Sequence, residues 1–350
     1  MRKQIEQCAN RNRVRADMRK CGNMCLYRRA LTGVLAVLLA VEISACGGKA
    51  KPGQETGVNQ KAEITQEKAS APVWKDMRPE RSMELSYAKQ FSVDYYDGGY
   101  DLIQVQDDST CLVVPEGAAV PEGLPASITV LQKPLDHVYL AATSAMDLIA
   151  ALGRVDRITL SGTKESGWYV DAARQAMEDG TLSYAGKYSA PDYEQILSSG
   201  CDLALESTMI YHVPDVKAQL EQLKIPVFVE RSSYEEHPLG RMEWIRLYGV
   251  LFDAEETAEQ LFQEQVQQLD TVLTGQSVGK SAAFFYITSN GAVNVRKPGD
   301  YVAKMIELAG GSYVPKTADM DENALSTMNM QMETFYAEAK EADCLIYNST

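Results

Sequence analysis

Alternating apolar and polar positions divide the chain into strand-like and helix-like segments. Residues 91–95 alternate, Asp97-Gly98-Gly99 follows as a turn, and apolar runs at 102–105 and 112–114 continue the pattern. Short alternating runs separated by turn residues are typical of antiparallel strands. This part of the chain therefore predicts a β-meander or hairpin that leads into a domain.

From residue 138 the pattern changes to a regular succession of strands and helices. Such alternation predicts an α/β fold in which a mostly parallel sheet is covered by helices on both faces. The predicted strands are 138–142, 157–162, 182–186, 202–207 and 226–231. The predicted helices are 144–153, 168–180, 190–200 (opened by Pro191 and closed by Gly200) and 213–225.

Two longer helices are predicted next, over residues 238–251 and 254–273. In the second, apolar residues recur three and four positions apart and form one stripe. Twenty helical residues reach ~30 Å, the diameter of a small domain. A second strand–helix series then follows, with strands at 282–288, 293–296 and 344–350 and helices at 301–310 and 332–341.

The end of the chain resembles an earlier part of it. Aligning residues 201–208 with 343–350 matches a leucine, a serine and a threonine, and a helix with a glutamate near its start precedes each segment (Glu194 and Glu333). This favours two pseudo-repeated lobes over chance similarity. Because no helix follows the last strand, we expect the second lobe to be incomplete.

The beginning of the chain has the features of a secretory signal. Arg28-Arg29 precede the apolar run Leu31–Val41, which is too short to span a bilayer, and Ile43-Ser44-Ala45-Cys46 resembles a bacterial lipobox. We expect residues 1–45 to be removed, from a start at Met1, Met18 or Met24, and Cys46 to carry a lipid such as palmitate. The polar segment 46–72 then predicts a flexible tether.

Charge and cysteine content exclude several classes of protein. The net charge is −14, which disfavours electrostatic binding of nucleic acid or anionic lipid. Beyond Cys46 the cysteines are Cys111, Cys201 and Cys344, whose odd number and wide spacing predict neither a disulfide framework nor a metal site.

Polar and aromatic residues gather in the predicted loops at the carboxyl ends of the strands, where open α/β sheets bind ligands. Each residue alone is explained as well by an ordinary solvated loop, but together they favour a ligand site. The candidate ligand-binding residues are Thr143, Ser144, Thr163, Trp168, Lys187, Tyr188, Glu206, Ser207, Tyr211, Arg231, Ser233, Tyr234, Arg241, Asn290 and Arg296. The arginines offer charge-assisted contacts to an anionic ligand.

No catalytic motif supports an enzyme. His137, His212 and His237 are isolated in the sequence, so a nucleophile–histidine unit could form only through the fold. Three methionines, Met328, Met330 and Met332, are explained better by packing than by a soft metal. We therefore predict no catalytic residues, no cofactor and no directly bound metal.

From residue 138 onward the chain resembles the substrate-binding lipoproteins of ABC importers for iron–siderophore, haem and vitamin B12-type chelates, the class III periplasmic-binding proteins. The resemblance lies in the lipobox and in the order of segments 144–158, 190–208, 224–230, 235–252 and 333–350. It implies two α/β lobes joined by one long helix, here 254–273, with the ligand between them. It also implies a permease and a cytoplasmic ATPase as partners, with Glu194 and Glu333 docking onto permease arginines.

The resulting hypothesis is a monomeric lipoprotein anchored on the extracytoplasmic face of the membrane, which captures a metal chelate such as a ferric siderophore, haem or cobalamin. The expected domains are 73–236 (first lobe, with a β-rich leader), 237–274 (helical connector) and 275–350 (second lobe). The role of the β-rich segment 85–135 is open. Two alternatives also remain open, an extracytoplasmic enzyme using His212 or His237 as base and a ligand-sensing domain.

Overall fold

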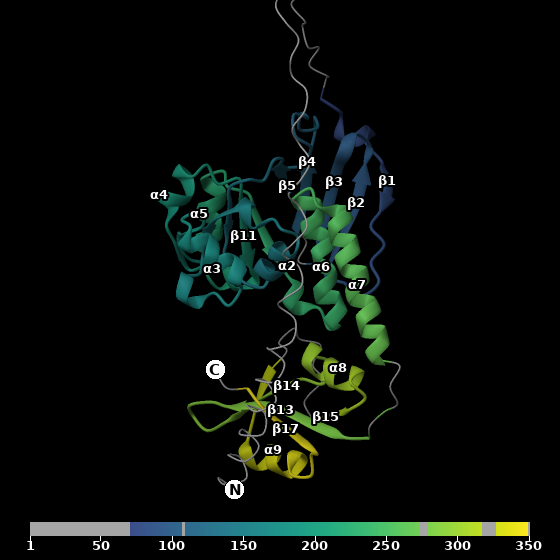
Figure 1. Cartoon of the computed structure of the whole chain (residues 1–350). Helices are drawn as coiled ribbons and strands as arrows, with labels where there is room; N and C mark the ends of the chain where they lie inside the picture. Colours follow the sequence, from purple (N-terminus) through teal and green to yellow (C-terminus); the bar gives the residue numbers. More distant parts are fainter. Residues whose placement is uncertain (1–70, 107–108, 274–276, 278, 317–326, 349–350) are drawn as a thin grey trace, which may run out of the picture. The chain divides into compact units, whose positions relative to one another are not determined.

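The structure is a computed structural model that describes residues 71–106, 109–273, 277, 279–316 and 327–348 (Figure 1). The signal segment 1–45, the lipobox cysteine and the tether up to residue 70 lie outside the described residues. No described helix is long and apolar enough to cross a membrane. Among the described cysteines, Cys201 and Cys344 are free thiols and Cys111 is buried in the main core.

The first sheet has five strands in the order β1-β2-β3-β4-β5. Their bounds are β1 Pro79–Ser82, β2 Phe91–Tyr96, β3 Tyr100–Val105, β4 Ser109–Val114 and β5 Ile128–Gln132. Strands β2, β3 and β4 form the predicted antiparallel meander, to which β1 adds an unpredicted antiparallel strand, whereas β5 pairs with β4 in parallel. In β2, Phe91, Val93 and Tyr95 are buried on one face, as the alternating pattern predicts.

The second sheet is entirely parallel, with strand order β12-β11-β6-β7-β8. Its strands are β6 Val138–Leu140, β7 Ile158–Ser161, β8 Ser183–Tyr184, β11 Leu203–Ser207 and β12 Val227–Glu230. The short strands β9 Gly186–Lys187 and β10 Ala190–Pro191 form a separate antiparallel hairpin. The predicted α/β fold with a parallel sheet is confirmed.

Helices cover both faces of this sheet (Figure 1). One face packs against α2 Ala145–Ala151, α3 Asp171–Glu178 and α6 Pro238–Leu251, and shares a core with the first sheet. The other face packs against α4 Tyr193–Ser198 and α5 Pro214–Gln222 around Tyr139, Ala204 and Leu220. Two separate cores therefore stabilise the sheet.

Helix α6 turns sharply into α7 Glu255–Leu273. A Cβ atom added at Gly249 would lie 2.8 Å from Ala258 Cβ and 3.0 Å from Glu255 Cα, so the two helices meet where only glycine fits. The turn residue Asp253 has a φ of 52°. The α6–α7 corner is therefore built around a glycine contact and a left-handed residue.

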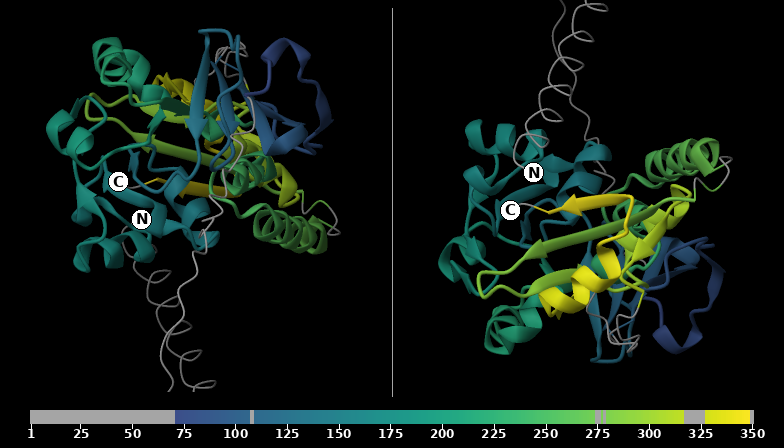
Figure 2. Two further views of the ribbon diagram at one scale, coloured as in Figure 1. Left: turned by 90° about the horizontal axis from the view of Figure 1, so that it is seen from above. Right: turned by 90° about the horizontal axis from the view of Figure 1, so that it is seen from below.

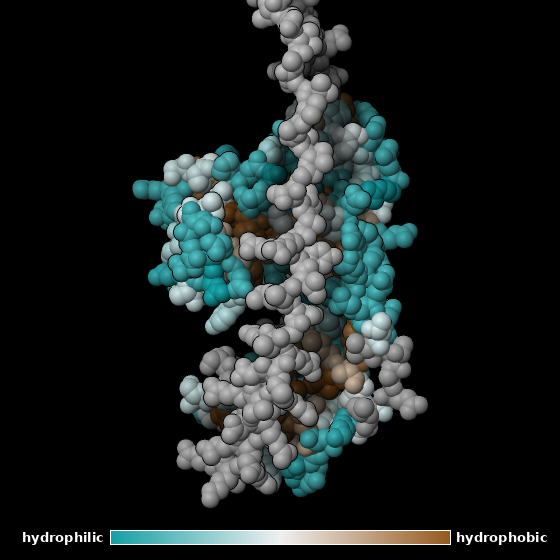
Figure 3. Space-filling model, in the orientation of Figure 1, coloured by the Kyte–Doolittle hydropathy of each residue, from teal (hydrophilic) through white to brown (hydrophobic). Residues whose placement is uncertain are grey.

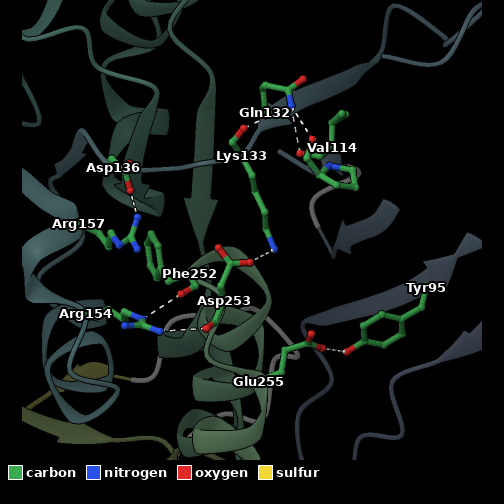
Figure 4. Close-up of polar contacts among 11 residues, drawn as sticks. Tyr95, Val114, Gln132, Lys133, Asp136, Arg154, Arg157, Phe252, Asp253 and Glu255 are labelled. Carbon is green, nitrogen blue, oxygen red and sulfur yellow. Dashed lines mark hydrogen bonds and ion pairs between the residues drawn. The ribbon is translucent and has the colours of Figure 1, made fainter. Parts of the chain in front are cut away.

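Polar contacts from three other elements fix this corner (Figure 4). Arg154 donates to the carbonyls of Phe252 and Asp253, each at 3.0 Å. Lys133 Nζ lies 2.7 Å from Asp253 Oδ1, and the Tyr95 hydroxyl donates to Glu255 Oε1 at 2.9 Å. These contacts join β2, the segment after β5 and the segment after α2 to the α6–α7 corner.

The C-terminal sheet is mixed, in the order β15-β13-β14-β16, with β17 paired in parallel to β13 (Figure 2). Its strands are β13 Ser281–Ile287, β14 Val293–Arg296, β15 Ser312–Val314, β16 Thr327–Met330 and β17 Cys344–Tyr347. Helices α8 Tyr301–Leu308 and α9 Met332–Ala339 accompany it. Every residue of β17 is exposed, and apolar surface reaches solvent near α8 (Figure 3).

Some predicted elements differ from the structure. Helix 190–200 begins at Tyr193 because Asp192 accepts the Gln195 N–H as its cap, while Pro191 belongs to β10. The strand predicted at 182–186 contributes only two residues, Ser183 and Tyr184, to the parallel sheet, and Gly186 belongs to β9. Met328 and Met330 lie in β16, and both pack in the C-terminal core, which supports the packing interpretation for these two. Met332, at the start of α9, is exposed and does not follow it.

Candidate functional site

All five strands of the second sheet run in one direction, so their carboxyl ends lie at one edge. Thr143 and Ser144 follow β6, Thr163 follows β7, Ser207 ends β11 and Arg231 follows β12. The fold therefore brings together residues that are far apart in the sequence. This edge is the candidate ligand site.

The predicted site residues differ in exposure. Thr143, Ser144, Lys187, Tyr211, Ser233 and Asn290 are exposed. Thr163, Tyr188, Ser207, Arg231, Tyr234, Arg241 and Arg296 are half-buried. Trp168 and Glu206 are buried. The first two groups reach solvent, and the third is enclosed by protein.

The burial of Trp168 contradicts its assignment as a ligand-contacting side chain. Its ring is 5% exposed and packs in the main core, and its Nε1–H donates to Ser161 Oγ at 3.2 Å. The loop presents the neighbouring Tyr169 to solvent instead, with 95% of the residue exposed. Burying a large aromatic ring contributes much free energy to folding. In this loop the ring buried in the core is that of Trp168, and that of Tyr169 is exposed.

Glu206 is also enclosed by protein. It is 0% exposed, and neither of its carboxylate oxygens has a hydrogen-bond partner among the described residues. Burial raises its pKa to about 8, and its nearby negative charge contributes to the raised pKa values of the Tyr139 and Tyr193 phenols. Glu206 is therefore a protonated acid at neutral pH and makes no direct ligand contact in this state.

Glu230, at the end of β12, holds the first residues of two neighbouring loops in place. Its carboxylate accepts Ser144 Oγ at 2.9 Å and the Ser232 N–H at 2.8 Å. Burial raises the pKa of this carboxyl, and the hydrogen bonds from Ser232 and Ser144 act in the opposite direction. Glu230 thereby links the loop after β6 to the loop after β12.

Arg231 and Arg241 are held by the protein itself. Arg231 Nε donates to Gln90 Oε1 at 3.2 Å, and its guanidinium carbon lies 4.4 Å from the Tyr234 ring centre. Arg241 donates from Nε to the Glu235 carbonyl at 3.3 Å and from Nη2 to the Ser233 carbonyl at 2.5 Å. Both guanidinium groups therefore have fixed orientations.

Tyr301 lies beside two of the predicted arginines. Its ring centre is 3.6 Å from the guanidinium carbon of Arg241 and 5.7 Å from that of Arg296. Arg296 is also 3.8 Å from Asp300 Oδ2. Asn290 lies away from this group, in the β13–β14 turn, where it accepts from Thr288 Oγ1.

Two buried glutamates that the sequence reasoning missed hold the segment between β1 and β2. Glu243 Oε1 and Oε2 accept the N–H groups of Ser86, Tyr87 and Ala88 at 2.7–2.9 Å. Glu235 accepts those of Lys89 and Gln90 at 2.9–3.0 Å and the Trp244 Nε1–H at 3.0 Å. We call residues 86–90 the strap.

The histidines have separate environments. His137 lies 3.9 Å from Asp202, and His212 is exposed. His237 Nδ1 accepts the Leu239 N–H and caps α6, while its ring stacks on Tyr87 with centres 4.7 Å apart. Among the described residues no group of three His, Cys, Asp or Glu side chains is arranged to hold a metal ion.

The two glutamates singled out for docking have matching positions. Glu194 is the second residue of α4 and Glu333 the second residue of α9, and both are exposed. A surface groove of about 460 Å³ lies beside Glu194, between α4 and α5, and is also lined by Tyr193, Leu197 and Asp215.

No protein-family model matches the chain. An uncharacterized lipoprotein of Methanocaldococcus jannaschii is 23% identical over 91% of this chain and 79% of its own length.

Among solved structures, the haem-binding protein HutB of Vibrio cholerae has a TM-score of 0.48 at 17% identity, covering 60% of this chain and 75% of its own. The vitamin B12-binding protein BtuF of Vibrio cholerae has a TM-score of 0.44 at 17% identity, with coverage of 62% and 77%. The petrobactin-binding protein YclQ of Bacillus subtilis has a TM-score of 0.49 at 12% identity, with coverage of 61% and 70%.

Proposed function

We propose that the chain is an extracytoplasmic solute-binding lipoprotein of an ABC importer. It captures a metal chelate between two lobes and passes it to a permease. A ferric siderophore is the first candidate, and haem or a corrinoid the alternatives. Cys46 carries the lipid anchor, and the polar segment 46–72 tethers the receptor near its permease, which raises the effective concentration for docking.

The observation that carries this proposal is the set of polar and aromatic side chains at one edge of the parallel sheet. Open α/β sheets bind ligands at this edge. Exposed Thr143 and Tyr211 offer hydroxyls and an aromatic face, and half-buried Arg231 and Arg241 offer fixed cationic groups. Such a combination suits a bulky ligand with anionic and apolar parts.

The test is calorimetric titration of the purified full chain with ferric enterobactin, haemin and cyanocobalamin. We expect saturable binding of at least one of these chelates, and Arg231→Ala should weaken binding of an anionic one by about tenfold. Arg174→Ala is the matched control, because Arg174 is an exposed arginine of α3 that pairs with Asp171 and is not among the candidate ligand-binding residues. The proposal fails if the wild-type chain binds none of the three probes.

A further inference from the structure

The N–H groups of the strap are held by side-chain carboxylates and not by the backbone of a neighbouring strand or helix. Its five consecutive N–H groups, from Ser86 to Gln90, donate to side-chain carboxylates of Glu235 and Glu243. Both glutamates are buried, at 3% and 0% exposure. Charge-assisted hydrogen bonds in such an environment are short and strong, so the strap is fixed against the start of α6.

The strap passes very close to the backbone of α6 at Gly240. A Cβ atom at this position would lie 3.0 Å from the Tyr87 carbonyl oxygen and 3.3 Å from Glu235 Oε2. Any larger residue would push the strap and the carboxylate away from the helix. The close packing leaves Glu235 little freedom to reorient.

The two glutamates differ in their contacts outside the strap. Glu243 has Arg246 as its other partner, at 3.3 Å. Glu235 is connected to both arginines at the candidate site. Its side chain fixes the Gln90 N–H, and the Gln90 side chain accepts Arg231 Nε. Its own carbonyl accepts Arg241 Nε.

We infer that Glu235 is a positioning residue that sets the orientation of Arg231 and Arg241 for the anionic part of the ligand. This inference rests on the proposed function and deepens it, because it specifies an anionic ligand. In both arginines the protein engages Nε. In Arg241 the Nη2 group is also engaged, by the Ser233 carbonyl. The Nη groups of Arg231 and Nη1 of Arg241 are then presented in a fixed direction to ligand oxygens.

The experiment compares Glu235→Gln with Glu243→Gln. Each substitution keeps the shape of the side chain but turns one acceptor oxygen into an NH₂ group that opposes the backbone donors. Both variants therefore weaken the strap. Only Glu235→Gln loosens the anchor of Gln90, which holds Arg231, and of the Glu235 backbone, whose carbonyl accepts Arg241 Nε. Glu243→Gln is thus the matched control for any general loss of stability.

The first measurement needs no ligand. Proton–nitrogen correlation spectra report the Nε–H groups of Arg231 and Arg241, assigned with Arg231→Lys and Arg241→Lys. We expect Glu235→Gln to move both signals and Glu243→Gln to leave them in place. Gln90→Ala should move the Arg231 signal alone, which keeps the test available if Glu235→Gln does not fold.

The second measurement is titration with ferric enterobactin, an anionic chelate, and with cyanocobalamin, which carries no net charge. For the anionic probe we expect Glu235→Gln to bind about tenfold more weakly than Glu243→Gln. Equal displacement of the arginine signals in both variants, or none in Glu235→Gln, would overturn the inference. If the signals respond as expected but the wild-type chain binds no chelate, the positioning role holds and the proposed function fails.

Discussion

At the residue scale, the most consequential single side chain is Glu206. It lies at the carboxyl end of β11 with no exposed surface, and its carboxylate oxygens have no partner among the described residues. A charged carboxylate that is buried without a partner costs much free energy, so the Glu206 carboxyl group stays protonated instead. Glu206 is therefore a source of pH-dependent stability rather than a ligand contact.

The sign of this dependence follows from its raised pKa. Between the ordinary value of 4.5 and about 8, the folded chain holds a proton at Glu206 that the unfolded chain releases. The stabilising contribution is present below pH 4.5 and is lost as the pH rises toward 8, with a slope of up to about 1.4 kcal/mol per pH unit. Denaturant unfolding between pH 5 and 8 measures it.

Glu206→Gln should flatten this slope and make the chain more stable than wild type near pH 8. Glu165→Gln, at an exposed glutamate on the surface, should leave the slope as it is. A slope that persists in Glu206→Gln would show that another group is responsible.

Residue roles were predictable from the sequence only where neighbours in the chain determine them. The loop with Trp168 and Tyr169 was located, but which of the two rings enters the core depends on Ser161 and the packing around it. Glu235 and Glu243 were missed because their backbone partners lie 145–157 positions earlier in the chain. No local spacing reports a contact of that kind.

At the scale of elements, periodicity predicted α6 from Pro238 to Leu251 and β14 from Val293 to Arg296 with the bounds that the structure has. It missed β1 and β5, which lack a clear alternation of burial. Strand β5 joins its sheet through parallel pairing with β4. Pairing partners of this kind are set by the tertiary fold, and single-sequence patterns do not contain them.

The α6–α7 corner gives a prediction at this scale. Gly249→Ala should destabilise the chain by about 1–3 kcal/mol, because its Cβ would overlap Ala258 Cβ at 2.8 Å. The midpoint of denaturant unfolding measures the loss. Gly299→Ala is the control, since no heavy atom lies within 4 Å of the added carbon there, and it should change stability by less than about 0.5 kcal/mol. Equal losses of stability in both variants would contradict a contact between α6 and α7 that depends on Gly249.

At the scale of the whole molecule, the described residues include two sheets accompanied by helices, the parallel second sheet and the mixed C-terminal sheet, and α7 lies between them in the sequence. The second half was harder to predict because its sheet is mixed. Strand β13 pairs with β15 and β17 in parallel but with β14 in the antiparallel sense. The pseudo-repeat nevertheless identified equivalent helix–strand pairs in the two sheets, since α4 precedes β11 and α9 precedes β17.

This equivalence leads to the last prediction, which concerns delivery rather than capture. If Glu194 and Glu333 dock the receptor onto cationic side chains of a permease, reversing their charge should abolish docking at both points. The double variant Glu194→Lys/Glu333→Lys should bind its chelate with unchanged affinity, because both side chains are exposed on α4 and α9 and neither is among the candidate ligand-binding residues. Uptake of the labelled chelate should fall by at least about tenfold.

A control separates a specific contact from a general change of charge. Glu165→Lys/Glu178→Lys makes the same change at two exposed glutamates before and within α3 and should leave uptake intact. Uptake that survives the Glu194/Glu333 reversal, alongside normal chelate binding, would favour a sensor that hands its signal to a different partner. A loss of uptake in both double variants would instead mean that docking depends on the overall negative charge of the chain and not on the carboxylates of Glu194 and Glu333.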